Sequence, residues 1–284
     1  MTTFDFDWLT QDHLKLQGKA YLPETPLKAI ICTVHGFAEH FGRYTHVAEY
    51  MTAQGYGLIG FDLRGHGRSE GKRAHTPNFN ALLEDVRSFI ALIIEKFPDI
   101  PLFLYGHSMG GNIVTNFILN YKPSYLQGVI VTSPWLKLAF TPPAIKLWLA
   151  NLMAKIYPQF TEKNELNAKE LSHDEEVGKR YNTDPLVLHT ITAKLFSEVT
   201  KAGLYALSHA SSFNLPLLLM HGTGDNITSF KASQDFALKA PSQLISTEWW
   251  KDMRHELHNE IIKTQVLGRM SEWIDGQLGA KLSV

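Results

Sequence analysis

The stretch Gly106-His107-Ser108-Met109-Gly110-Gly111 places a serine between glycines in the pattern G-x-S-x-G. It directly follows the apolar run Pro101–Tyr105 and precedes a helical pattern over Asn112–Tyr121. In this context the serine sits on a sharp turn, and the unpaired N–H groups at the start of the helix face any oxyanion that forms there. Small residues also cluster in ordinary turns, so the flanking strand and helix are what predict a nucleophile at Ser108.

Outward from this turn, short apolar runs alternate with amphipathic stretches along the chain. Such alternation predicts an α/β fold with a mostly parallel sheet, whose nearly continuous apolar strands are buried on both faces. The predicted strands are Ala29–His35, Gly57–Phe61, Pro101–Tyr105, Leu126–Thr132, Leu215–Met220 and Gln243–Trp249. The predicted helices are Gly42–Gln54, Phe79–Phe97, Asn112–Tyr121, Phe230–Ala240 and Asn259–Leu278.

One interval, residues 134–212, is far longer than a simple crossover between two strands requires. It is predicted to be mostly helical, with a second helical stretch at Thr190–His209. An apolar stripe at helical spacing runs through Ile145, Trp148, Leu149, Leu152, Met153 and Ile156. An insertion here would lie over the carboxyl ends of the strands, where ligands bind in such sheets. We therefore expect a core of residues 1–133 and 213–284 and a helical cap of residues 134–212; the alternative is that the stripe only packs on the core.

Composition bounds the possible functions. The chain has 284 residues, 44% of them hydrophobic and 19% charged, as in a soluble globular protein. Its net charge of −1 gives no reason to expect nucleic-acid binding. The single cysteine, Cys32, lies in an apolar run and is expected to be buried, so no disulfide framework exists. The acidic N-terminus lacks a signal-peptide pattern, and no apolar stretch approaches the roughly 20 residues of a membrane span, so a cytoplasmic location is expected.

A serine nucleophile needs a base, and the base needs an orienting acid; in G-x-S-x-G hydrolases these follow in the order serine, acid, histidine. Leu217–Met220 is an apolar strand that runs into a glycine-containing loop with Asp225. His255 follows the last apolar strand. We therefore predict a triad in which Asp225 orients His255 and His255 accepts the proton of Ser108.

Two rival assignments are weaker. Asp252 is close to His255 in sequence, but a short loop rarely lets an aspartate reach the far ring nitrogen of a histidine three residues on. His258 competes with His255 as the base, yet it falls where a helix is expected to begin. The two histidines are three residues apart, whereas the zinc helix motif needs a spacing of four, so no metal site is predicted.

The oxyanion also needs donors, and two backbone N–H groups are predicted to supply them. One belongs to Met109, the residue after the nucleophile. The other belongs to Phe37, because the strand ending in His35-Gly36 can turn at the glycine and present the next N–H group.

Beyond these elements, the chain resembles the monoacylglycerol lipases and the related lysophospholipases of the α/β-hydrolase superfamily. The resemblance covers about residues 28 to 275 and rests on the segments Val34–His40, Arg43-Tyr44, Asp62–Gly71, Gly106–Gly111 and Tyr181–Leu186. It implies an α/β-hydrolase fold, with an eight-stranded, mostly parallel sheet and an inserted helical cap. It also implies cofactor-free ester hydrolysis through an acyl-serine intermediate. The chain departs from the animal enzymes at Phe37, where a small residue is commoner, and across the cap helix.

The sequence and the resemblance together predict a serine ester hydrolase for single-chain lipid esters, with a monoacylglycerol as the leading substrate. Lysophospholipase and broad carboxylesterase activities stay open, as does a non-enzymatic binding protein on the same fold. The cap is expected to contact membranes or lipid aggregates through its apolar stripe. The residues predicted to contact the substrate are Glu39, Arg43, Trp148, Leu149, Leu152 and His258.

Overall fold

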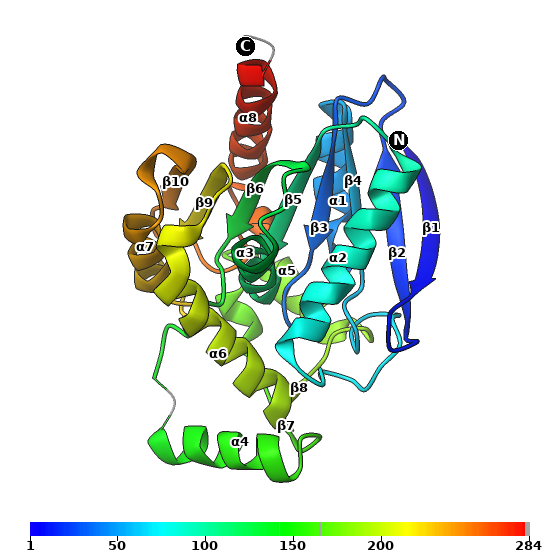
Figure 1. Cartoon of the computed structure of the whole chain (residues 1–284). Helices are drawn as coiled ribbons and strands as arrows, with labels where there is room; N and C mark the ends of the chain where they lie inside the picture. Colours follow the sequence, from blue (N-terminus) through cyan, green and yellow to red (C-terminus); the bar gives the residue numbers. More distant parts are fainter. Residues whose placement is uncertain (142, 165, 282–284) are drawn as a thin grey trace.

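A sheet of eight strands forms the centre of the molecule, with the strand order β1-β2-β4-β3-β5-β6-β9-β10 (Figure 1). The structure is a computed structural model that describes residues 1–141, 143–164 and 166–281. The strands of the sheet are β1 (Thr2–Leu9), β2 (Lys15–Leu22), β3 (Ala29–Val34), β4 (Tyr56–Phe61), β5 (Leu102–His107), β6 (Leu126–Thr132), β9 (Leu217–Gly222) and β10 (Ile245–Trp250).

The six strands from β4 to β10 in this order are parallel to one another. They are the six strands predicted from the apolar runs, with ends displaced by at most two residues. Every residue of β3, β4, β5 and β9 is buried, because helices cover both faces of this part of the sheet. The predicted α/β fold with a mostly parallel sheet is confirmed.

The antiparallel edge formed by β1 and β2 was absent from the prediction made from the apolar runs. In β1, Phe4, Phe6 and Trp8 alternate with Asp5 and Asp7, and only the aromatic side packs against the core. This two-residue alternation is the signal of a strand with one solvated face. This alternation differs from the continuous apolar runs of the central strands. Because the aspartates interrupt the run, β1 was not predicted as a strand.

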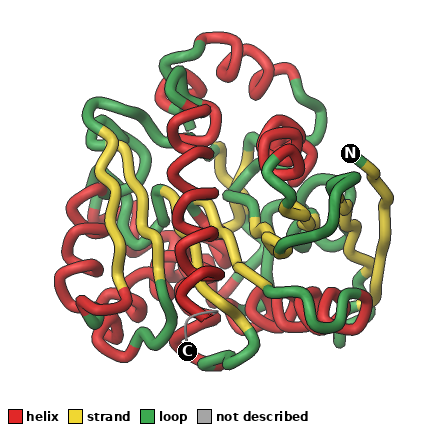
Figure 2. Tube along the Cα trace, turned by 90° about the horizontal axis from the view of Figure 1, so that it is seen from above, coloured by secondary structure: helices red, strands yellow, loops and turns green. Residues whose placement is uncertain are grey.

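Helices lie on the two faces of the sheet (Figure 2). The buried apolar side chains form two cores. On one face lie α1 (Thr45–Ala53) and α8 (Lys263–Lys281). On the other lie α2 (Phe79–Lys96), α3 (Met109–Tyr121), α7 (Phe230–Lys239) and part of α6 (Ala193–His209). Short 3-10 helices occur at Phe41–Tyr44, Ala168–Glu170, Ala210–Ser212, Ser242–Leu244 and Leu257–Asn259.

The long interval between β6 and β9 contains α4 (Ala144–Ile156), β7 (Thr161–Lys163), α5 (Glu175–Thr183), β8 (Thr190–Thr192) and α6. In Figure 1, α4 lies at the bottom, away from the sheet, and α6 runs from it back to α3. The side-chain amide of Asn112 connects α3 to the start of this interval and to α6. It donates to the backbone oxygens of Trp135 and Val199 at 2.7 and 2.9 Å. Among the described residues, no helix has the length and apolar character needed to cross a membrane.

Candidate active site

Ser108 occupies the turn between β5 and α3, with backbone angles φ 54° and ψ −116°. Such a conformation is costly for a residue with a side chain and persists only where the surroundings enforce it. The flanking glycines make the turn possible. A Cβ atom on Gly106 would lie 2.5 Å from the backbone oxygen of Gly110, and one on Gly110 would collide with the backbone oxygen of Val34. The pattern G-x-S-x-G is therefore required by close backbone packing around the serine.

The carboxyl ends of neighbouring strands bring His255 and Asp225 to this serine. Asp225 follows β9 and His255 follows β10. The Nε2 atom of His255 lies 2.9 Å from Ser108 Oγ, and its Nδ1 atom lies 2.7 Å from Asp225 Oδ2. All three side chains are buried. The structure thus brings together the three residues predicted as a triad, whereas Asp252 lies in an exposed turn whose backbone N–H group binds Thr223 Oγ1.

Asp225 has further partners that sequence reasoning missed. Its Oδ2 atom lies 3.0 Å from His221 Nε2 and accepts the Thr228 hydroxyl at 2.9 Å. Its Oδ1 atom accepts the backbone N–H groups of Ile227 and Thr228. Burial alone would raise the pKa of Asp225, but His255 and His221 hold it below its ordinary value. His221 was not predicted as a site residue, since it directly follows the predicted strand Leu215–Met220 and belongs to no motif.

The surroundings of His255 make its imidazole a stronger base than an ordinary histidine. Burial alone would lower the pKa of His255, but the Asp225 carboxylate outweighs burial and raises it above its ordinary value. The neighbouring His107 behaves differently, because burial and the nearby His255 lower its pKa to about 3. His107 is therefore neutral at physiological pH, and its ring packs 4.8 Å from that of His255.

The two backbone N–H groups predicted as oxyanion donors belong to Met109 and Phe37. Met109 is the first residue of α3, so its N–H group is one of those a helix leaves without an intrahelical partner. In the described part of the chain, the N–H group of Phe37 has no hydrogen-bond acceptor. The Phe37 ring packs edge-on against Trp135 at 6.1 Å between centroids, and both side chains line the cavity described below.

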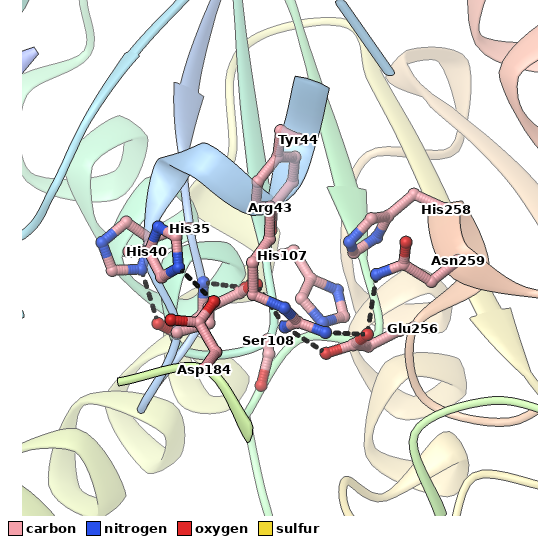
Figure 3. Close-up of polar contacts among 12 residues, drawn as sticks. His35, His40, Arg43, Tyr44, His107, Ser108, Asp184, Glu256, His258 and Asn259 are labelled. Carbon is pink, nitrogen blue, oxygen red and sulfur yellow. Dashed lines mark hydrogen bonds and ion pairs between the residues drawn. The ribbon is translucent and has the colours of Figure 1, made fainter. Parts of the chain in front are cut away.

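Glu39 and Arg43 are engaged with protein groups. Arg43 lies between two carboxylates: Nη1 donates to Glu39 Oε2 at 2.8 Å, and Nη1 and Nη2 donate to Glu256 Oε1 and Oε2 at 2.7 and 2.8 Å. We call this group of three the Arg43 bridge (Figure 3 labels Arg43 and Glu256). Glu256 was not predicted as a site residue, because a charged residue beside the histidine carries no motif of its own.

His258 is buried behind the site, away from the residues that line the cavity. Its ring is fully buried and stacks on the Tyr44 ring, with 4.7 Å between centroids, and it is not among the cavity residues. Burial and the neighbouring His107 hold the pKa of His258 well below its ordinary value. The predicted substrate contact of His258 is corrected, since the 3-10 helix Leu257–Asn259 directs this ring into the core.

A cavity with a volume of about 250 Å³ opens onto Ser108 and His255. Its polar lining includes Glu39, Glu256 and residues of β7 and of the segment between β7 and α5. The apolar lining residues are Phe37, Trp135, Leu138, Phe140, Leu149, Ala150, Met153, Phe160, Leu166, Leu171, Ile191, Phe196 and Ile227. The site therefore combines the Ser108 hydroxyl with a cavity whose lining contains many apolar side chains and several carboxylates.

The predicted apolar stripe of the helix α4 is divided between two surroundings. Leu149 and Met153 line the cavity. Trp148 and Leu152 do not line it, and neither does Arg43, so these three predicted substrate contacts are not present as direct cavity contacts. Trp148 instead exposes 59% of its surface, while Ile145 and Ile156 expose 68% and 70%.

Cys32 is buried, and burial raises the pKa of its thiol, so it is no nucleophile at neutral pH. Within the residues that the structure describes, His, Cys, Asp and Glu side chains form no group of three suited to a metal ion.

Comparison with known proteins assigns the chain to a protein family. The pattern of the hydrolase family described as serine aminopeptidase, S33, matches residues 25–262. The chain is 36% identical over 275 residues to an abhydrolase domain-containing protein of Dictyostelium discoideum, covering 96% of this chain and 29% of that protein. It is 30% identical over 259 residues to the monoacylglycerol lipase of Mycolicibacterium smegmatis, covering 91% of this chain and 92% of that enzyme.

The crystal structure of the Paleococcus ferrophilus monoacylglycerol lipase superposes with a TM-score of 0.81 at 29% identity, covering 98% of this chain and all of that one. These likenesses confirm the resemblance seen in the sequence motifs. The chain belongs to the hydrolase family described as serine aminopeptidase, S33, in the branch of the α/β-hydrolases that contains the monoacylglycerol lipases, and it is a carboxylic ester hydrolase.

Proposed function

We propose that this protein hydrolyses monoacylglycerols to glycerol and fatty acid through an acyl-serine intermediate. The observation that carries this proposal is the pairing of Ser108 Oγ with His255 Nε2 at 2.9 Å, in the lining of a cavity with many apolar side chains. An acyl chain fits such a cavity because its burial releases apolar surface from water. The names of the similar lipases of Mycolicibacterium smegmatis and Paleococcus ferrophilus point in the same direction.

The reaction proceeds in two steps on the residues described above. Ser108 Oγ attacks the ester carbonyl carbon while His255 Nε2 takes the hydroxyl proton, and Asp225 stabilises the resulting imidazolium. The N–H groups of Phe37 and Met109 hold the tetrahedral oxyanion. The C–O bond to glycerol breaks as His255 returns the proton to the leaving oxygen. A water molecule, deprotonated by His255, then releases the fatty acid from Ser108.

The charges around the cavity favour a neutral head group over a phosphate. Among the described lining residues are four glutamates, Glu39, Glu162, Glu170 and Glu256, and one lysine, Lys163. Arg43 lies behind this wall, with both terminal nitrogens bound to carboxylates. Phosphate recognition relies on free arginine or lysine donors, so a lysophospholipid would meet an acidic wall. This supports a monoacylglycerol over the lysophospholipid alternative.

Residues 134–212 are proposed to act as a cap that carries substrate from a lipid surface to Ser108. Leu149 and Met153 line the cavity, and α4 and its flanks also expose large apolar side chains, Leu149 itself among them. The exposed set is Phe140, Ile145, Trp148, Leu149, Ile156 and Tyr157. Apolar side chains gathered on one exposed segment suit contact with lipid aggregates. Because the net charge is only −1, this contact would rest on apolar burial more than on attraction to anionic lipid.

A substrate panel tests the proposal. Monoacyl, diacyl and triacyl glycerols, lysophosphatidylcholine and lysophosphatidic acid of matched acyl length would be compared by fatty-acid release. We expect the highest kcat/KM for the monoacylglycerol and the lowest for lysophosphatidic acid. Higher turnover of either lysophospholipid would contradict the neutral head-group assignment. A fluorophosphonate probe that labels the parent chain but not Ser108→Ala would exclude a non-enzymatic binding protein.

A further inference from the structure

Two loops that meet at Ser108 from distant parts of the sequence are joined by the Arg43 bridge. The loop after β3 carries Phe37 and Glu39, and the loop after β10 carries His255 and Glu256. Arg43 binds one oxygen of Glu39 and both oxygens of Glu256 at 2.7 to 2.8 Å. The bridge therefore connects the segment with the proposed oxyanion donor to the segment with the proposed base.

On the oxyanion side, Glu39 determines how the loop turns. Its Oε1 atom accepts the backbone N–H group of Gly36 at 2.7 Å and the hydroxyl of Tyr44 at 2.9 Å. The N–H group of Gly36 immediately precedes that of Phe37 in the chain. Because Glu39 binds the N–H group of Gly36, the orientation of the peptide between Gly36 and Phe37 is restricted. The N–H group of Phe37 is then left for the substrate oxygen.

On the base side, Glu256 is held by its backbone and by its side chain. Its backbone N–H group donates to the oxygen of Leu171 at 2.8 Å, and its Oε2 atom also accepts the amide of Asn259 at 2.7 Å. Figure 3 shows Glu256 between Arg43 and Asn259, with Ser108 nearby. Since Glu256 is bonded directly to His255, fixing Glu256 also fixes the backbone from which the imidazole projects.

The charges of the bridge also suit the reaction. Burial alone would raise the pKa of Glu256, but Arg43 holds it at about 2, so this carboxylate is ionised at working pH. One guanidinium faces two carboxyl groups, and both carboxyl groups favour the protonated form of His255. A buried ion pair contributes little to stability compared with apolar residues of the same volume. Stability alone is therefore a weak reason for this arrangement.

We propose that Glu256 is a positioning residue: through Arg43 it holds the Phe37 loop in register with His255, and its charge favours the imidazolium that forms during turnover. This inference rests on the proposed hydrolytic function of Ser108, His255 and Asp225. It assigns Glu256 and Arg43 to the alignment of the reacting groups and not to the binding of the alcohol.

The test uses Glu256→Gln in the full-length chain, with a water-soluble short-chain ester as substrate. The glutamine keeps the shape but removes the charge. We expect kcat to fall about 10- to 100-fold, as for a misplaced reacting group, with KM nearly unchanged.

The ionisable groups that interact with His255 are Asp225, His107, His258, Glu39 and Glu256. Loss of the Glu256 charge should lower the pKa of His255, so the acid limb of kcat/KM should move to lower pH. Arg43→Lys, which keeps the charge but not the fork of two donors, should lose less of kcat than Arg43→Met.

A matched control exists elsewhere in the chain. Arg64 is also buried between two carboxylates, with Nε 2.6 Å from Asp85 Oδ2 and Nη1 2.8 Å from Asp12 Oδ2. Asp85→Asn should lower Tm but leave kcat per folded molecule and the acid limb at their parent values. If Glu256→Gln behaved like Asp85→Asn, the bridge would be merely structural and the proposal overturned. A raised KM with unchanged kcat would also overturn it, because Glu256 would then bind substrate directly. Failure of the proposed function is distinct, since it would appear as full esterase activity in Ser108→Ala.

Discussion

The Nε2 atom of His255 lies 2.9 Å from the Oγ atom of Ser108, although 147 positions separate these residues in the chain. The other ring nitrogen, Nδ1, lies 2.7 Å from Asp225 Oδ2. Each nitrogen of the imidazole therefore has its own partner, which suits a base that takes a proton on one side while a carboxylate orients it from the other. The first three predictions below follow from this arrangement.

Replacing Ser108 by alanine should lower kcat by several orders of magnitude, because among the described residues no other hydroxyl is paired with His255 Nε2. Asp225→Asn should cost on the order of 10⁴ in kcat, since the amide favours the wrong imidazole tautomer. Both values would be measured as fatty-acid release from a monoacylglycerol. Circular dichroism and Tm would verify that each variant is folded, and an active, folded Ser108→Ala would disprove the nucleophile assignment.

The two late histidines should respond differently to truncation. His255→Ala removes the group that contacts Ser108 and should reduce kcat by several orders of magnitude. His258→Ala removes a buried ring stacked on Tyr44, so it should lower Tm while kcat per folded molecule changes by less than tenfold. Steady-state kinetics normalised to the folded fraction would compare them. Were His258→Ala inactive and His255→Ala active, the base would be misassigned.

Activity should depend on pH through His255. A general base must be neutral before it can accept a proton, and Asp225 raises the pKa of His255 above its ordinary value against the opposing effect of burial. Activity should therefore be lost as pH falls through this raised pKa, and the acid limb of kcat/KM should lie above the ordinary imidazole value of about 6.5. A pH series with the short-chain ester would measure the limb. A flat profile from about pH 5 to 9, with chemistry rate-limiting, would argue against the role.

Polar substitutions on α4 should distinguish a residue that lines the cavity from an exposed residue outside it. Leu149→Gln places an amide in the cavity wall and should reduce kcat/KM for long-chain monoacylglycerols about tenfold or more, with a much smaller effect on a short-chain ester. Trp148→Gln changes an exposed residue outside the cavity. It should weaken turnover of aggregated long-chain substrate and leave the soluble ester unaffected. Equal losses on both substrates, together with a lower Tm, would instead indicate that these side chains act as core.

Much of the fold followed from local patterns in the sequence. The runs around β3, β5, β6 and β9 predicted buried parallel strands, because a strand covered on both faces is apolar at every position. The hairpin of β1 and β2 was missed, since its alternating Phe and Asp residues carry a different signal. The turn at Ser108 could be predicted because close packing at Gly106 and Gly110 leaves no room for a side chain.

The candidate site was only partly predictable. Asp225 and His255 could be found because each follows an apolar strand, and the carboxyl ends of parallel strands meet at one edge of the sheet. His221, Thr228 and Glu256 were missed, because they act through contacts with residues distant in the sequence or without a motif.

The sequence by itself therefore determined the six parallel strands, the strained serine turn and the order of serine, acid and histidine, since these depend on local apolar pattern and backbone sterics. Only the tertiary structure decided which groups those residues meet. It turned His258 into the core, joined Glu39 to Glu256 through Arg43, and placed Leu149 in the cavity lining but Trp148 outside it. The physical reason is that side-chain partners depend on how distant loops and helices dock, and a one-dimensional pattern of residues does not encode that geometry at any single position.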